Sequence, residues 1–389
     1  MKPIKQTLMS GAIILALSLA FTSCDDILGE WDKPAPNPVV PTPEPEPTPT
    51  VSATGITLDQ SFKVIKLSDA SVTITATITP SDATDKTIWT TGDDTVAKVV
   101  DGVVTPVGKG IATITAQAGD QTATCEIFVG EVVDLSTKTA DYPANDFDIL
   151  TEALNASYKL TIPDGAKVAF DGLTTSNTVT CSGDATIILV DGSTNTVDAS
   201  AIDQAAGIKV GGSGTTLTIN AETAGTGSLF AKGGSEGAGI GTRSGYNSTA
   251  TCGDITITGG TVIATGGYYS AGIGTGYAGS SYADAYQTCG NILISGGTVT
   301  ANGGNSAAGI GTGSSESMAP RKAYQVCGTI TITTGVTCVT ATKGISSPNS
   351  IGKGYYGYNC TQTIGAITIG GVVKDQSEFA AVTYTYPAP

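Results

Sequence analysis

The segments CGDITI (Cys252–Ile257), CGNILI (Cys289–Ile294) and CGTITI (Cys327–Ile332) repeat one pattern in the second half of this 389-residue chain. Each is followed by a Gly-Gly turn or a variant of it, and then by an Ala-Gly-Ile-Gly-Thr motif or a variant. The isoleucine of that motif recurs at five positions, Ile208, Ile240, Ile273, Ile310 and Ile351. Self-similarity at such a period is typical of a solenoid, in which each copy forms one coil and stacks on the next.

Each copy joins a segment of nearly constant length to one of variable length. Cys252 and Ile273 are 21 residues apart, as are Cys289 and Ile310, whereas the connections from Ile273 to Cys289 and from Ile310 to Cys327 span 16 and 17 residues. The constant segment is poor in helix formers and holds short alternating runs between Gly-Gly pairs, which predicts three strands in each coil of a parallel β-helix. The variable segment predicts a loop that projects from one fixed corner.

The repeat places three cysteines at one coil position, with small or apolar residues at the same place in the flanking copies (Cys252, Cys289 and Cys327; Gly214 and Ile364). Replacement by Ile suits a buried apolar column and does not suit a metal ligand. The chain also has no Cys-x-x-Cys pair. We therefore expect mostly free, buried thiols and no metal, with disulfides between coils or through Cys338 and Cys360 as the alternative.

The two ends of the solenoid need covers, because a bare sheet end invites pairing with other chains. Residues 141–180 are expected to cap the first coil, with Asp146–Leu154 as a short helix or an irregular lid. Strands are expected near Tyr158–Ile162 and Lys167–Phe170. At the other end, Ala380–Tyr386 predicts a closing strand.

Residues 53–130 show short runs that alternate with period two, such as Ser71–Thr79 and Ile111–Ala116, and these predict an antiparallel sandwich. The stretch resembles a group 2 bacterial immunoglobulin-like domain. The resemblance rests on Gly55–Leu58, Ala76–Thr84, Trp89, Val96–Ala97, Asp101–Thr105 and Gly110–Ala116. It implies a rigid spacer with Trp89 as an anchor in the core, and Cys125 is expected to be a buried thiol.

The expected fold class is therefore all-β: an immunoglobulin-like β-sandwich over 53–130, followed by a right-handed parallel β-helix within the capped repeat domain, 131–389. Residues 141–370 are similar to the glycine-rich β-helical repeat domains of bacterial surface proteins. They are more loosely similar to carbohydrate-binding relatives of the pectate-lyase-like β-helices. That second resemblance is one of architecture and carries little functional weight.

The N-terminus indicates export. Two lysines precede an apolar run over 11–21, and residues 1–23 predict a cleavable lipoprotein signal peptide. Phe21–Cys24 resembles a lipobox, which implies that Cys24 is the lipid-attachment residue. The acidic residues behind Cys24 resemble the export signal of Bacteroidetes-type surface lipoproteins. Residues 24–52 are then an acidic and proline-rich tether, and the expected location is the outer membrane at the cell surface, held by the lipid only.

Composition excludes several function classes. The chain contains no histidine, so serine and cysteine triads of the usual kind and zincin motifs are excluded. With 19 basic and 34 acidic residues its net charge is −15, which disfavours binding to nucleic acid. Gly239–Gly241 and Gly272–Gly276 lack the strand-to-helix context and the lysine of a P-loop, which argues against a nucleotide site.

Ten of the 14 tyrosines lie between Gly227 and Gly370, mostly in the variable segments. Tyr286 and Tyr324 have equal offsets from the column cysteine, and Tyr277 and Tyr355 have equal offsets from the motif isoleucine, so each pair is expected to stack. Rows of exposed rings suit the apolar faces of sugars. The candidate carbohydrate-binding residues are Tyr246, Tyr268, Tyr269, Tyr277, Tyr282, Tyr286, Tyr324, Tyr355, Tyr356 and Tyr358. Packing of loops onto the solenoid, or contact with a protein partner, is the alternative.

The expected function is non-catalytic binding or adhesion at the cell surface, to a glycan or another cell-surface ligand. One rival is a polysaccharide lyase or glycoside hydrolase, for which the acids of the repeat region fall at unrelated coil positions (Glu236, Asp254, Asp284 and Glu316). The other rival is a structural surface component. No catalytic residue and no cofactor is expected, although Asp191, Asp198 and Asp203 leave room for calcium. The oligomeric state is left open.

Overall fold

The computed structural model describes residues 50–223 and 225–387. In these residues it contains strands and two short 3-10 helices, and no α-helix. The expected signal peptide, Cys24 and most of the tether lie outside the described residues. The described chain is all-β, as the sequence predicts.

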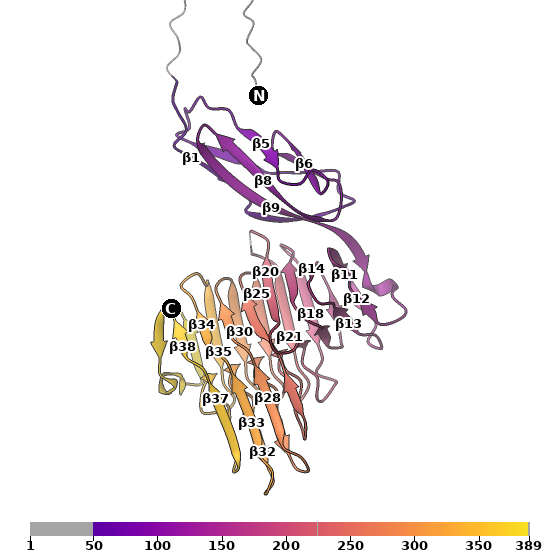
Figure 1. Ribbon diagram of the computed structural model, residues 1–389, viewed down its shortest axis with the longest axis vertical. Coiled ribbons are helices and arrows are strands. Elements are labelled where there is room, and N and C mark those ends of the chain that lie inside the picture. Colours follow the sequence, from indigo (N-terminus) through magenta and orange to yellow (C-terminus); the bar gives the residue numbers. More distant parts are fainter. Residues whose placement is uncertain (1–49, 224, 388–389) are drawn as a thin grey trace, which may run out of the picture. The chain divides into compact units, whose positions relative to one another are not determined.

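An N-terminal sandwich is formed by the first nine strands (Figure 1). Its small sheets pair β1 (Gly55–Leu58) with β4 (Ala76–Thr79), and β7 (Val103–Pro106) with β3 (Val72–Thr73) and β6 (Ala97–Val100). Its large sheet orders β5 (Ile88–Thr91), β8 (Gly110–Ala118), β9 (Gln121–Asp134) and β2 (Phe62–Lys66). Ile114, Ile127 and Cys125 are fully buried between the sheets. Trp89 is only partly buried and packs against two core clusters.

The second half is a parallel β-helix with three sheets that run along its axis (Figure 1). The first sheet contains β10 (Tyr142–Pro143), β13 (Leu160–Ile162), β16 (Val179–Cys181), β19 (Ile208–Lys209), β22 (Ile240–Gly241), β26 (Ile273–Gly274), β31 (Ile310–Gly311) and β36 (Ile351–Gly352). The second contains β11 (Asp148–Thr151), β14 (Ala166–Phe170), β17 (Ala185–Leu189), β20 (Thr216–Ala221), β24 (Asp254–Ile257), β29 (Ile292–Ile294), β34 (Ile330–Ile332) and β38 (Ile367–Ile369). The third contains β12 (Ala153–Leu154), β15 (Thr174–Thr175), β18 (Thr194–Asp198), β21 (Ser228–Lys232), β25 (Thr261–Thr265), β30 (Thr298–Asn302) and β35 (Cys338–Thr342).

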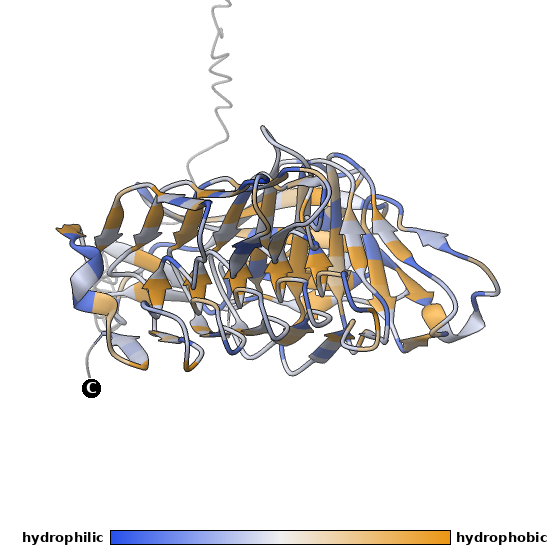
Figure 2. Cartoon of the chain, turned by 90° about the horizontal axis from the view of Figure 1, so that it is seen from below, coloured by the Kyte–Doolittle hydropathy of each residue, from blue (hydrophilic) through white to orange (hydrophobic). Residues whose placement is uncertain are grey.

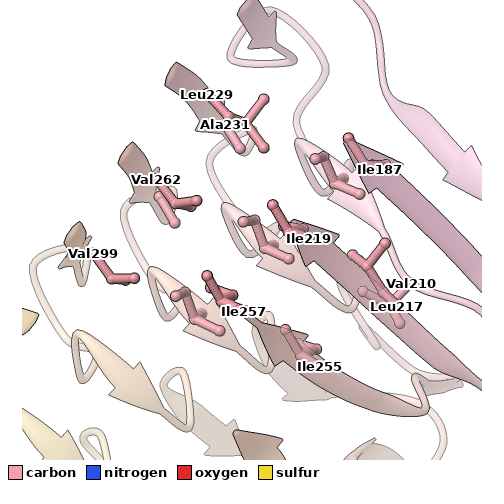
Figure 3. Packing of buried hydrophobic residues seen from close by; sticks show 14 of the residues in the cluster. Ile187, Val210, Leu217, Ile219, Leu229, Ala231, Ile255, Ile257, Val262 and Val299 are labelled. Atoms are coloured by element: carbon pink, nitrogen blue, oxygen red, sulfur yellow. The ribbon is translucent and has the colours of Figure 1, made fainter. Parts of the chain in front are cut away.

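Equivalent residues of successive coils share a column, and these columns fill the core. Ile219 lies opposite Ile257 in the second sheet, and Val262 lies opposite Val299 in the third. In Figure 3 the two sets point toward one another across the interior, and all four side chains are fully buried. Apolar positions recur at the same place in successive strands of Figure 2. Parallel pairing in register thus turns the sequence repeat into a continuous core.

The second glycine of the Ile-Gly motif is required by backbone geometry. Gly241, Gly274 and Gly311 have φ angles of 142°, 134° and 131°, in a region that other residues rarely adopt. A Cβ at Gly274 would also collide with the carbonyl oxygen of Gly311 in the next coil. The motif therefore marks a point of close approach between successive coils.

The column cysteines are buried and free, as expected. Cys289 lies opposite Cys327, and Cys327 lies opposite Ile364. Gly214 was assigned wrongly to this column: it forms a turn at φ 85°. Val210 of the preceding coil joins the buried cluster at this end of the column. Gly253, which follows Cys252, donates its backbone N–H to the carbonyl of Gly211, which follows Val210, and this hydrogen bond sets the register of the two coils.

The N-terminal end of the solenoid is not covered by a helix, so that expectation for 146–154 was wrong. Asp148–Thr151 and Ala153–Leu154 are already strands of the first coil. The cover is β9, which leaves the sandwich and pairs in parallel with β11. The 3-10 helix η1 (Leu135–Thr137) follows it and buries Leu135. A strand covers this end in place of a helix because β9 supplies backbone hydrogen bonds to the open edge of β11.

The C-terminal end is closed by antiparallel strands. β39 (Val372–Lys374) pairs with β38, and β40 (Thr383–Tyr386) pairs with β35, which confirms the expected closing strand. The 3-10 helix η2 (Gln376–Phe379) buries Phe379 against the last coil.

The sandwich and the solenoid also meet through side chains. The Glu222 carboxylate has no exposed side-chain area and lies 3.0 Å from the Lys63 ammonium. It accepts backbone hydrogen bonds of 2.7 Å from Val64 and from Asp191. A small apolar cluster with Phe128 at its centre lies across the same junction. The junction is therefore a packed interface with a satisfied buried charge.

Candidate ligand-binding site

The variable segments form paired strands and not simple loops. The strands β23 (Thr249–Thr251), β28 (Ala285–Cys289), β33 (Ala323–Cys327) and β37 (Cys360–Ile364) make one small parallel sheet. β27 (Ala278–Ser280) and β32 (Ser315–Ser317) make a second one. Figure 1 shows β28, β33 and β37 side by side, leaving the coils together. We call these two sheets the flange. The expectation of one fixed corner was correct, while the expectation of a loop was not.

A column of buried glutamines holds the flange together. Gln287, Gln325 and Gln362 lie opposite one another and are almost fully buried. The Gln325 amide donates to the carbonyls of Gly276 and Ser314, at 2.8 and 3.1 Å, and its oxygen accepts from the Gln362 amide at 2.8 Å. Each amide thus satisfies backbone groups that the insertion would leave unpaired. The sequence analysis missed this column, although the repeated Tyr-Gln-x-Cys spacing marks it.

Four of the predicted tyrosines form one cluster on the flange and the adjoining Gly-Gly turn. Ring centroids are 4.8 Å apart for Tyr268 and Tyr269, 5.0 Å for Tyr269 and Tyr277, and 6.4 Å for Tyr277 and Tyr246. Tyr268 and Tyr246 are exposed, whereas Tyr277 is buried beneath the others. Gly279 makes room for this packing, since a Cβ there would collide with the rings of Tyr246 and Tyr277. We call these four residues the tyrosine cluster.

Tyr286 and Tyr324 stack as predicted, with ring centroids 4.9 Å apart and an interplanar angle of 7°. They occupy the outward face of β28 and β33, and the flanking strands place Thr249 and Thr361 in the same column. Tyr286 is exposed. The outer face of each ring is therefore next to a small hydroxyl side chain.

The expected stacking of Tyr277 on Tyr355 is wrong. The coil between them carries Ser314 at this position: the Ser314 carbonyl accepts from the N–H that follows Tyr277, and the Tyr355 carbonyl accepts from the N–H that follows Ser314. Tyr355 and Tyr356 instead line a shallow hollow of about 280 Å³ with Ser346–Pro348.

Tyr282 and Tyr358 are the two most exposed of the ten tyrosines, at 81% and 82% exposure. The ten predicted residues therefore fall into several separate groups, and the structure does not bring them into one row.

Two of the four acids converge although their positions in the repeats are unrelated. Glu316 accepts from the Tyr277 hydroxyl at 3.5 Å, and Glu236 accepts from the Ser244 hydroxyl at 2.8 Å. Burial, followed by the negative charges of Glu316 and Glu236, raises the pKa of Tyr277 well above its ordinary value. The phenol thus stays protonated and acts as a donor at neutral pH.

The other two acids have structural roles. The Asp254 carboxylate accepts from the backbone N–H of Asn291 at 2.7 Å, and the Asp284 carboxylate accepts from that of Lys322 at 3.0 Å. Each therefore fixes the start of the next coil.

The structure gives little support for a calcium site at Asp191, Asp198 and Asp203. The carboxylate of Asp191 accepts from the backbone and hydroxyl of Thr226, and that of Asp198 accepts from the backbone of Ser200. Across 50–223 and 225–387, no three acids and cysteines gather in a way that would hold a metal ion. No helix in the same residues is long and apolar enough to cross a membrane.

Comparison with known proteins bears on the sandwich first. Residues 52–127 match the family model of the bacterial Ig-like domain (group 2). The chain carries a group 2 bacterial immunoglobulin-like domain. Residues 255–277 and 292–314, which lie in successive coils, match the model of the beta helix repeat. Both resemblances seen in the sequence are thus confirmed at the level of domain composition.

An alpha-L-arabinofuranosidase of Bifidobacterium longum subsp. longum is 44% identical to this chain over 68 residues. The match spans 17% of this chain and 6% of that enzyme. An immunoglobulin-like domain joined to β-helix repeats fits a surface-binding or carbohydrate-related protein.

Proposed function

We propose that this protein is a lipid-anchored lipoprotein of the outer membrane that binds glycans at the cell surface without catalysis. In this proposal Cys24 carries the lipid, the tether and the immunoglobulin-like domain act as a spacer, and the flange presents the ligand-binding tyrosines. The observation that carries it is the tyrosine cluster, where the exposed ring of Tyr246 packs on buried Tyr277 and the exposed ring of Tyr268 packs on Tyr269. A fixed aromatic surface binds the apolar face of a sugar at low entropic cost, while Glu316 and Ser281 supply hydrogen-bonding groups beside it.

A glycan array with the chain from residue 25 onward, without its lipid, tests this proposal. Isothermal titration with a glycan that binds then compares Tyr268→Ala and Tyr246→Ala with the unaltered protein. Each loss of a ring is expected to weaken binding about tenfold, the effect of roughly 1.5 kcal/mol of aromatic contact. Phe230→Ala is the matched control, because Phe230 has the same 39% exposure as Tyr246 but lies in the third sheet of the solenoid. Equal binding by all variants would overturn the role of the cluster.

A glycoside hydrolase or lyase is the second candidate, and the convergence of Glu236 and Glu316 on Tyr277 is the observation that favours it. Two carboxyl groups beside one sugar site are what glycosidic cleavage requires. Release of reducing or unsaturated ends from a bound polysaccharide, abolished in Glu316→Gln, would replace the binding proposal with this one. Silence in both assays would favour a structural surface component.

A further inference from the structure

A hollow of about 440 Å³ lies where the flange begins. It is lined by residues from three successive coils, among them Lys209, Gly211, Arg243 and Thr249–Thr251. Its size is within the range of small-ligand sites. None of the ten predicted tyrosines lines it, so it is distinct from the tyrosine cluster.

The hollow exists because the flange starts abruptly. In the preceding coil the chain turns within Gly211–Thr215, where the N–H of Thr215 bonds to the carbonyl of Gly212. The next coil inserts the residues that form β23, the first strand of its sheet. The step between a short turn and an inserted strand leaves a concave corner.

The corner holds two cations without acidic partners. Lys209 and Arg243 form no ion pair with any described residue, and the Arg243 guanidinium donates only to the carbonyl of Ser244, at 3.0 Å. Glu236, in the same coil as Arg243, has its carboxylate engaged by the Ser244 hydroxyl. In a chain of net charge −15, two partnerless cations in one hollow indicate attraction for an anion.

Backbone donors face the same corner. The carbonyl of Ser248 and the N–H of Cys252 bond to β28, so alternate residues of β23 direct their backbone groups to the partner strand. By the geometry of a parallel strand, Thr249 and Thr251 direct their N–H and C=O groups to the open edge. Both side chains are exposed and carry hydroxyls.

An aromatic face adjoins the hollow. Thr249 of the hollow lies directly opposite Tyr286, whose other face is covered by Tyr324 at 4.9 Å. Because threonine is much smaller than tyrosine, Thr249 covers less of the Tyr286 ring than Tyr324 does on the other side. Cations and hydrogen-bond donors therefore line the hollow, and an aromatic ring lies one strand beyond it, next to Thr249.

We propose that this hollow is a subsite for an acidic sugar residue, whose carboxylate or sulfate lies between Lys209 and Arg243 and whose ring packs on Tyr286. The proposal rests on the glycan-binding function and names its ligand class. The flange then offers two aromatic surfaces: the tyrosine cluster, which bears carboxylates and suits neutral sugar faces, and this hollow, which selects anions.

Titration calorimetry with three oligosaccharides of equal length tests the proposal on the chain from residue 25 onward. The probes are an oligouronate, its neutral methyl ester and a sulfated oligosaccharide. At least one of the two anionic probes is expected to bind at least tenfold more tightly than the methyl ester, with a preference that weakens as salt rises. Whichever of them binds identifies the carboxylate or the sulfate as the recognised group. Equal binding of the neutral ester would overturn the proposal.

Variants separate this subsite from the rest of the flange. Lys209→Gln, Arg243→Gln and Tyr286→Ala are each expected to weaken binding of the acidic probe about tenfold. Lys209→Gln and Arg243→Gln are also expected to leave neutral-glycan binding at Tyr268 unchanged. Lys232→Gln, which removes an exposed lysine from the third sheet, is the matched control and should have no effect.

The outcomes distinguish the two proposals. If neutral glycans bind, and Lys209→Gln changes the affinity neither for them nor for the acidic probe, the acidic subsite is wrong and the glycan-binding function stands. If an oligoglutamate peptide binds and the acidic sugars do not, the hollow pairs with a peptide strand along the β23 edge, and the sugar subsite is rejected.

Discussion

The described cysteines divide into two groups by exposure. Five of the seven are buried, whereas Cys338 and Cys360 are partly exposed. Burial raises the pKa of Cys181 to about 12. A hydrogen bond with Cys289, together with burial, raises the pKa of Cys327 well above its ordinary value. Since the thiolate is the reactive form, two features protect the buried thiols from reagents: the reagent cannot reach them, and their raised pKa keeps them protonated.

An alkylating reagent at pH 8 is therefore expected to modify only Cys338 and Cys360 in the native chain from residue 25 onward. Intact-mass spectrometry counts the modified thiols, and the other five should react only after denaturation. Cys338→Ser with Cys360→Ser is the control and should leave the native protein unlabelled. Modification of Cys289 at the rate of Cys360 would contradict the buried column.

The same thiols set a pH dependence. A thiol whose pKa is raised in the folded state holds its proton more tightly there than in the unfolded chain, where the pKa is about 8.5. Its stabilising contribution is therefore complete below about pH 8.5 and is lost as pH rises from there toward the folded-state value of about 12 for Cys181. The free energy of unfolding should fall over this alkaline range.

At the scale of elements, coil register decides which side chains meet. Parallel pairing brings Tyr286 over Tyr324 and Gln287 over Gln325, although each pair is 38 residues apart. The flange depends on this register because its strands are short and carry few apolar contacts of their own; apart from its cysteines, only small alanines form its buried cluster. Amide hydrogen bonds take the place of a hydrophobic core there.

Gln325→Leu is expected to destabilise the flange by about 2–4 kcal/mol, since it removes the side-chain donor of two buried carbonyls and one acceptor of the Gln362 amide. Because a solenoid opens locally, hydrogen exchange is the proper measurement, with faster exchange in β28, β33 and β37 than in the three main sheets. Gln204→Leu, at an exposed glutamine of the β18–β19 connection, is the matched control. Unchanged exchange in the flange would refute the bracing role.

At the scale of the whole described unit, the immunoglobulin-like domain continues into the solenoid. β9 belongs to the sandwich sheet and also pairs with β11, so one sheet runs from β5 to β39. Glu222 joins the two parts by its ion pair with Lys63 and by the hydrogen bond from the Val64 N–H, while the Asp191 N–H of the solenoid holds its other oxygen. The two domains are thus expected to unfold together, as one cooperative step.

Glu222→Ala is expected to cost about 3–5 kcal/mol and to separate that single calorimetric transition into two, because it leaves Lys63 and two buried N–H groups uncompensated. Glu131→Ala is the matched control: it removes the exposed ion pair with Lys109 and should change stability by at most about 1 kcal/mol. A single transition at an unchanged temperature in Glu222→Ala would show that the domains are coupled without Glu222, by β9 and the other contacts of the junction.

Sequence patterns alone predicted the all-β class, the immunoglobulin-like sandwich, the solenoid, the cysteine column from Cys252 to Cys327 and the stacking of Tyr286 on Tyr324. Each of these follows from a local pattern or from a repeat, because stacking in register converts equal positions in the sequence into neighbours in space. The predicted stacking of Tyr277 on Tyr355 was wrong for the same physical reason: only successive coils are neighbours, and the coil between these two tyrosines carries Ser314 at that position.

The folded chain was needed to show that the insertions form strands and that Glu236 and Glu316 both lie near Tyr277. It was also needed to show that Lys209 and Arg243 share a hollow and that β9 covers the first coil. These contacts join residues at unequal positions of different coils or domains. The path of each insertion depends on what its backbone groups can bond to, and that is set by the neighbouring coil as a whole. No local period encodes such pairings, so they appear only once the chain is folded.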